Sequence, residues 1–152
     1  MWFGTWAQTL ETVVSIVAAY VLALPLAFER EVRGRAGPGL RTMPLVSVGA
    51  CGYLLISRFL YERGVYDADG LFRTLRSVMT GIGFIGGGVI LKGTRDVRGL
   101  ATGAAVWMSG ALGAAVGLGY YEIAVVLGLA NVLVLEIQRR LARLARARSR
   151  EA

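Results

Sequence analysis

The chain has 152 residues, enough for one domain, and 55% of them are hydrophobic, above the roughly 45–50% of ordinary soluble domains. Its formal net charge of +7 suits either nucleic acid or a membrane surface as a partner. The absence of histidine and the single cysteine exclude an internal disulfide and argue against zinc sites and against Ser-His or Cys-His catalysis.

Five stretches without charged residues follow one another along the chain, and each is a candidate membrane-spanning helix. A spanning helix needs about 20 apolar residues, within a range of about 17–25. The first and fourth stretches are long enough alone, and the others reach this length because arginine side chains at their ends extend toward the interface. The sequence therefore predicts an all-α membrane protein, a compact bundle of about five transmembrane helices near 8–28, 43–60, 76–91, 100–117 and 121–138.

The loop after the first span carries charges at a membrane boundary. Glu29 closes the first helix, where its carboxylate can meet Arg41 or Arg98. Pro38 and Gly39 form a turn, and Thr42 is placed to cap the second helix. A boundary ion pair is either a functional site or a structural clasp, and both interpretations stay open.

The segment 61–75 is the longest polar loop on its side of the membrane. Leu71, Leu75, Val78 and Met79 recur at helical spacing and so share one face. This pattern predicts a short interfacial amphipathic helix that leads into the third span.

A glycine cluster marks the third span. It matches G-x-G-x-x-G, but no strand precedes it and no βαβ unit surrounds it, so dinucleotide binding is not expected. One interpretation is close helix packing through a GxxxG pair made by Gly83 and Gly87. The other is a broken or re-entrant helix whose freed backbone groups face a cavity, as at transporter ion sites. The cluster consists of Gly81, Gly83, Gly86, Gly87 and Gly88.

The fourth span repeats a small residue at every fourth position: Ala105, Ser109, Gly113 and Gly117. A flat stripe of this kind lets another backbone approach closely. We expect it to pack within the bundle or, alternatively, to form a self-association face of a homo-oligomer.

Basic residues decide the expected orientation. Most of them lie in 29–42, 92–99 and 139–152, and the positive-inside rule places these segments in the cytoplasm, with the N-terminus outside. We divide the chain into a transmembrane domain, 1–138, and a basic cytoplasmic helical tail, 139–152. The tail suits anionic lipid; nucleic-acid binding is not expected, because no aromatic platform or nucleic-acid motif accompanies the charge.

Acidic side chains are scattered along the chain and form no cluster with the oxygen ligands that magnesium requires. A metal ligand set therefore cannot be assigned from the sequence. We expect no cofactor and no enzymatic activity.

Several segments, taken together, resemble the MgtC/SapB family. They are LAFERE (26–31), GLRT (39–42), TGIGFIGGGVI (80–90), VRGLATGAAVW (97–107) and ALGAAVGLG (111–119), in the family's order and spacing. The resemblance implies a bacterial inner-membrane protein of about five helices. It also implies links to growth under magnesium limitation, to virulence and to restraint of the F-type ATP synthase.

The resemblance also selects candidate functional residues. Glu29, Arg30, Arg41, Thr42, Arg73 and Thr102 fall on characteristic family positions, as do several glycines of the third span. Where the family has an aspartate three residues before Arg73, this chain has Gly70, and Asp69 lies one position earlier. The soluble ACT-like domain of MgtC proper is not present, which indicates a short, SapB-like form.

Two classes of function follow. The first is a regulatory membrane protein that affects ion homeostasis, of magnesium for example, by helix contacts with another membrane protein such as ATP synthase or a cation transporter, through the faces of Gly113 and Gly117. The alternative is a transporter or channel for magnesium, another cation or a small solute.

Overall fold

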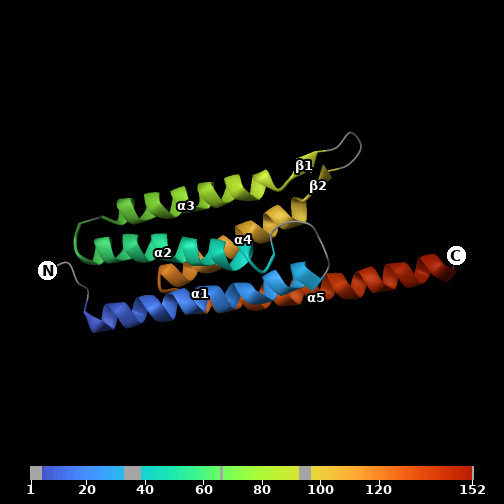
Figure 1. Ribbon diagram of the computed structural model, residues 1–152, viewed down its shortest axis with the longest axis horizontal. Helices are drawn as coiled ribbons and strands as arrows, with labels where there is room; N and C mark the ends of the chain where they lie inside the picture. Colours follow the sequence, from blue (N-terminus) through green and yellow to red (C-terminus); the bar gives the residue numbers. More distant parts are fainter. Residues whose placement is uncertain (1–4, 33–38, 66, 93–96, 152) are drawn as a thin grey trace.

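The computed structural model describes residues 5–32, 39–65, 67–92 and 97–151, without the side chains of 30–32, 91–92, 97–98, 135, 138–139 and 142–151. The described chain contains five helices and one short β-hairpin (Figure 1). Their bounds are α1 Trp6–Val32, α2 Thr42–Glu62, α3 Ala68–Gly88, β1 Leu91–Lys92, β2 Val97–Arg98, α4 Leu100–Gly117 and α5 Tyr121–Glu151. The predicted all-α bundle of five helices is confirmed.

The helices lie side by side along the long axis, and successive helices run in opposite directions (Figure 1). One end of the bundle, here called the amino end, holds the start of α1 and the turns after α2 and α4. The other end, here called the hairpin end, holds the start of α2, the β1–β2 hairpin and the far part of α5. Because the helices alternate in direction, the loops that the arginine distribution places on the same side of the membrane lie at the same end of the bundle.

Helix α4 is the centre of the bundle and packs against each of the four other helices. Its small residues make this possible: a Cβ at Gly113 would overlap the backbone of Ser47, and one at Gly117 would lie 2.6 Å from the Cys51 carbonyl oxygen. Such close approach maximises van der Waals contact, which is the main attraction between helices in hydrocarbon. The stripe on the fourth span therefore packs against α2 within the chain.

Buried serines satisfy their hydroxyl groups across helix contacts. Ser47 Oγ donates to the Ala19 carbonyl at 2.8 Å, which joins α2 to α1, and Ser109 Oγ donates to the Met43 carbonyl, which joins α4 to α2. A buried hydroxyl without a partner would cost roughly 1–3 kcal/mol. These bonds therefore fix the helices in register without leaving unpaired hydroxyls in the core.

Helix α3 differs from the prediction for 61–91. A single continuous helix from Ala68 to Gly88 replaces the expected interfacial helix followed by a separate span. Asp67 caps it by accepting the Gly70 amide at 2.8 Å. The helix is not broken within the glycine cluster, because its backbone groups remain paired along the helix, and it ends at Gly88 before the hairpin.

Three of the described helices are long and apolar enough to cross a membrane: Trp6–Glu29, Thr42–Glu62 and Leu100–Gly117. The apolar part of α5 is shorter, Tyr121–Val134, and α3 carries Asp69, Arg73 and Arg76 in its first half. Large hydrophobic side chains also point outward, with Trp6 and Phe84 90% and 85% exposed. Such an apolar exterior is what a lipid environment solvates and water does not.

Candidate functional site

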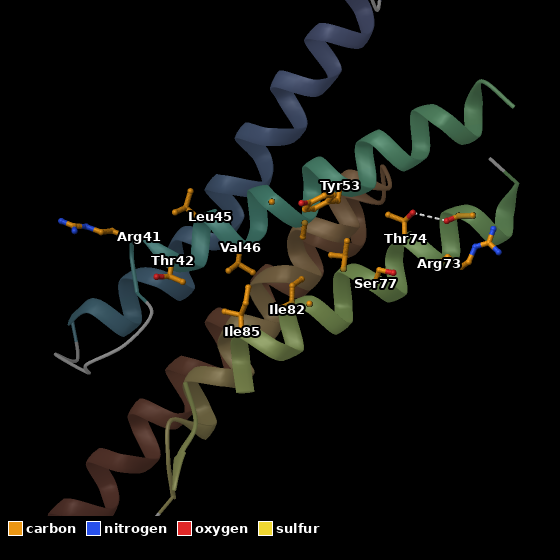
Figure 2. A pocket seen from close by; sticks show the side chains of 15 residues that line it. Arg41, Thr42, Leu45, Val46, Tyr53, Arg73, Thr74, Ser77, Ile82 and Ile85 are labelled. Atoms are coloured by element: carbon orange, nitrogen blue, oxygen red, sulfur yellow. Dashed lines mark hydrogen bonds between the residues drawn. The ribbon is translucent and has the colours of Figure 1, made fainter. Parts of the chain in front are cut away.

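A concave surface with a volume of about 820 Å³ lies between α2 and α3 (Figure 2). Gly49 of α2 and Gly81 of α3 hollow it out, since a Cβ at either position would meet no atom within 4 Å. Apolar side chains form most of the wall. We call it the α2–α3 groove; the residues that line it include Leu45, Val46, Gly49, Ala50, Tyr53, Thr74, Ser77, Val78, Gly81, Ile82 and Ile85.

Arginines mark the two ends of the α2–α3 groove. Arg41 lies at the hairpin end and Arg73 toward the amino end, and both guanidinium groups point away from the middle of the groove (Figure 2). Thr74 accepts a hydrogen bond from Ser57 of α2 at 3.0 Å and donates to the Gly70 carbonyl at 3.1 Å. The groove is thus cationic at its ends, apolar in its middle and held together by hydrogen bonds toward Arg73.

A second hollow of about 220 Å³ lies where α3 and α5 flank α4. Its floor is made by small residues of α4, with apolar walls from α3 and α5 on either side. An adjoining hollow of about 400 Å³ shares three residues with it, so the two form one strip along the bundle. We call the strip the α4 cleft; its floor is Gly110, Ala111 and Ala114, and its walls include Leu75, Met79, Trp107, Ile123 and Leu127.

Charged side chains meet between α1 and α2 at the amino end, in a cluster that the sequence reading missed. The side chain of Arg58, 11% exposed, pairs with Glu11 of α1 and lies 3.2 Å from Glu62. Gly119, with φ of +85°, lies against it, and a Cβ there would come 2.8 Å from the Arg58 Nη1. The i,i+4 spacing of Arg58 and Glu62 was a readable signal, whereas the pairing with Glu11 depends on how α1 and α2 pack.

The structure brings together only part of the predicted polar set. Arg41, Thr42 and Arg73 all line the α2–α3 groove. Glu29 is buried at 3% exposure in α1, and Thr102 is buried in α4. The remaining three are Asp69, exposed in the first turn of α3, and Arg30 and Arg98, whose side chains lie outside the described residues.

Thr42 does not cap α2 as expected. The residue before α2 is Arg41, which makes no side-chain cap, and Thr42 is the first residue of the helix. The carbonyl of Gly39 already accepts the amides of Thr42 and Met43. The turn before the helix is therefore hydrogen-bonded by the backbone itself, and the hydroxyl of Thr42 lines the groove instead.

The close helix contact of α3 is made by a different glycine from the pair that the sequence predicted. The expected Gly83–Gly87 packing pair does not form among the described residues, because a Cβ at either position, or at Gly88, would meet nothing within 4 Å. The close contact is made by Gly86, whose Cβ would lie 3.1 Å from the carbonyl oxygen of Gly103 in α4. Gly86 makes this contact, and Gly83 and Gly87 do not, because only one face of α3 points toward α4.

Titratable side chains do not gather into a metal site in the described part of the chain, where no three His, Cys, Asp or Glu residues come together. The two charged residues that line the α2–α3 groove are arginines. The metal ligand set, which the sequence left unassigned, thus stays unassigned.

Long apolar helices and an apolar outer surface define an α-helical membrane protein. The chain belongs to the MgtC family, whose model matches residues 16–144, so the resemblance seen in the sequence is confirmed. No solved structure gives a significant match.

Relatives from three bacteria are similar to most of this chain. YhiD of Escherichia coli strain K12, provisionally named a magnesium transporter, is 33% identical over 86% of the chain and 61% of its own length. MgtC of Salmonella typhimurium strain LT2 is 34% identical over 85% of the chain and 54% of its length. An uncharacterized protein of Synechocystis sp. strain PCC 6803 is 38% identical over 86% of the chain and 53% of its own length. The chain thus spans between 53% and 61% of the length of these relatives.

Proposed function

We propose that this chain is a multi-pass inner-membrane protein that regulates another membrane protein of ion homeostasis, such as a cation transporter or ATP synthase. It does so by binding a transmembrane helix of that protein in the α4 cleft. The observation that carries the proposal is the part of the cleft of about 220 Å³, which has a floor of small residues and apolar walls from α3 and α5. Arg76 and Thr80 line its extension of about 400 Å³ along α3. Family membership and the name of YhiD support the link to magnesium.

The chemistry of the α4 cleft suits a helix as its ligand. Inside a bilayer, lipid is as apolar as the helices, so association depends on close packing at small residues. Ala111, a small and partly exposed residue between the walls of the cleft, allows a partner backbone to approach α4 closely. Met79 and Trp107 on the wall supply an adaptable side chain and a large contact area, respectively.

This surface replaces the one expected from the sequence. Gly113 and Gly117 are occupied by α2, so they are not available to a partner. The face of α4 that remains open passes through Trp107 and Ala111, and α3 and α5 flank it. The proposed contact surface is therefore still on α4, but on a different face of the helix from the one expected from the sequence.

Magnesium transport is the second candidate function, and the name of YhiD favours it. The α2–α3 groove opposes it, because Arg41 and Arg73 line that groove and would repel a divalent cation. Liposomes containing the purified protein and a magnesium-sensitive dye distinguish the two functions. We expect no protein-dependent uptake, and uptake that saturates with magnesium concentration would overturn the regulatory proposal.

The cleft can be tested by photo-cross-linking in native membranes. A photoreactive amino acid at Met79, on the cleft wall, should give an adduct with one membrane protein. Ala111→Leu should abolish that adduct, because the leucine fills the cleft. Gly52→Leu is the matched control: it adds the same side chain to α2, where a Cβ meets no atom within 4 Å, and should leave the adduct unchanged.

Growth of a strain that lacks the gene, in magnesium-limited medium, gives the functional readout. We expect Gly52→Leu to restore growth as well as the wild-type chain does and Ala111→Leu to restore it poorly. An adduct that survives Ala111→Leu, or a Met79 probe that labels lipid alone, would contradict the proposed mode of action.

A further inference from the structure

The α2–α3 groove is long and mostly apolar. Its lining runs from Gly70 to Ile85 along α3, about 22 Å at 1.5 Å per residue. A groove of this length, with a volume of about 820 Å³, can take an extended hydrocarbon chain.

The apolar part of the groove also has the length of one lipid leaflet. From Thr42 to Tyr53 along α2 the distance is about 16 Å, close to half of a hydrocarbon core of about 30 Å. On the facing helix, Val78, Ile82 and Ile85 line the same stretch. Polar wall residues begin beyond it, at Ser77 and Thr74, near the depth where a chain from one leaflet would end (Figure 2).

The positive charge at the mouth of the groove favours an anionic lipid headgroup. Arg41 and Thr42 lie at the hairpin end of the groove, where a guanidinium and a hydroxyl can both donate to phosphate oxygens. Arg41 is exposed, so its guanidinium is accessible from the interface. The groove thus offers donors at its mouth and hydrocarbon contacts along its length.

We propose that the α2–α3 groove binds one anionic phospholipid from the leaflet at the hairpin end. Its phosphate meets Arg41 and Thr42, and one acyl chain lies between Leu45 and Val46 on α2 and Ile82 and Ile85 on α3. Val78 and Ile82 line both this groove and the α4 cleft, but the lipid lies against α2 and the cleft lies over α4, so the lipid site does not rest on the regulatory function. An anionic lipid here would fill the space between α2 and α3 at the hairpin end of the groove.

Native mass spectrometry of the whole detergent-solubilised chain tests the proposal. The probe is an equimolar mixture of phosphatidylglycerol and phosphatidylcholine with identical acyl chains. The wild-type chain should retain one phosphatidylglycerol preferentially. Arg41→Gln should reduce that preference about fivefold, the ratio that corresponds to roughly 1 kcal/mol for one cation near an anionic headgroup, and Arg140→Gln, which removes another exposed cation, should not.

Two glycine variants test the acyl-chain site. Gly49→Leu and Gly81→Leu place a side chain in the groove without a clash in the fold, and both should lower the binding of either lipid. Gly83→Leu, on the opposite face of α3 and also without close neighbours, is the matched control and should bind as the wild type does. Helical content and melting temperature, measured for each variant, show that the bundle is intact.

Three results would overturn the proposal. They are equal retention of the two lipids by the wild-type chain, wild-type lipid binding in both groove variants, and loss of lipid from Gly83→Leu to the same extent as from Gly81→Leu. Ala111→Leu should retain lipid normally, so failure of the lipid site and failure of the α4 cleft are distinguishable.

Discussion

Arg58 shows how a single cation is accommodated near the end of an apolar bundle. Its guanidinium lies between the carboxylates of Glu11 and Glu62, and Phe59 lies beneath it with the ring centre 5.3 Å away. Burial of an unpaired charge is costly, whereas a paired one is tolerated. Since Glu11 belongs to α1, the pair also joins α1 to α2 at the amino end.

Replacement of Arg58 tests this account at the scale of one residue. Arg58→Gln should destabilise the protein by about 1–3 kcal/mol, less than a fully buried pair would lose, because both carboxylates are partly exposed. Thermal unfolding in detergent measures the effect. Arg63→Gln, which removes an exposed arginine whose side chain donates to Gln8 at 3.4 Å, should change stability by less than about 0.5 kcal/mol. Equal effects of the two changes would refute the role given to Arg58.

At the scale of elements, identical residues have opposite roles on α3 and α4. Glycines of α4 are contact points: Gly103 meets Gly86 of α3, and Gly113 meets Ser47 of α2. Glycines of α3 such as Gly83 and Gly87 face outward with open space around them. Both helices are rich in glycine, so composition alone could not separate the two roles; only the rotation of each helix about its axis does so.

A matched pair of glycine-to-alanine changes separates the two helices. Gly113→Ala should destabilise the bundle by roughly 2 kcal/mol or more, because the new methyl group overlaps the α2 backbone. Gly83→Ala should be neutral or stabilise by up to about 1 kcal/mol, since alanine favours the helix and its methyl group meets no neighbour. Both are read from unfolding in the same detergent, and effects of the same sign would contradict the packing described for α4.

The whole molecule has a polarity along its long axis that the arginines predict and the helix directions reproduce. The turns after α2 and α4 lie at the amino end, whereas the start of α2, the hairpin and the C-terminal part of α5 lie at the hairpin end (Figure 1). Helix α5 continues well beyond the other helices, so its arginine-rich part projects from the bundle. The positive-inside rule assigns this end to the cytoplasm.

Cysteine labelling tests that orientation in intact cells. In a Cys51→Ala background, Val65→Cys at the amino end should react with a membrane-impermeant maleimide, and Arg140→Cys at the hairpin end should not. Permeabilised cells, in which both positions should react, provide the control. Labelling of position 140 but not of position 65 in intact cells would reverse the assigned orientation.

The sequence by itself determined the number of helices, the approximate bounds of all but the third, the membrane class and the family. Long apolar stretches bounded by arginines are sufficient for these, because a helix in hydrocarbon must pair its own backbone groups. Family motifs also selected Arg41, Thr42 and Arg73, which the structure places along one groove. What the sequence did not determine was which glycine meets which helix.

Tertiary structure alone decided the surfaces that remain open. Packing of α4 against α2 occupied Gly113 and Gly117 and left the Ala111 side of α4 open. The placement of α3 beside α2 formed the groove that Gly49 and Gly81 line. Tertiary structure also brought Glu11 to Arg58 across two helices. The physical reason is that a periodic pattern fixes which residues share a face, whereas the partner of that face depends on the simultaneous packing of all five helices.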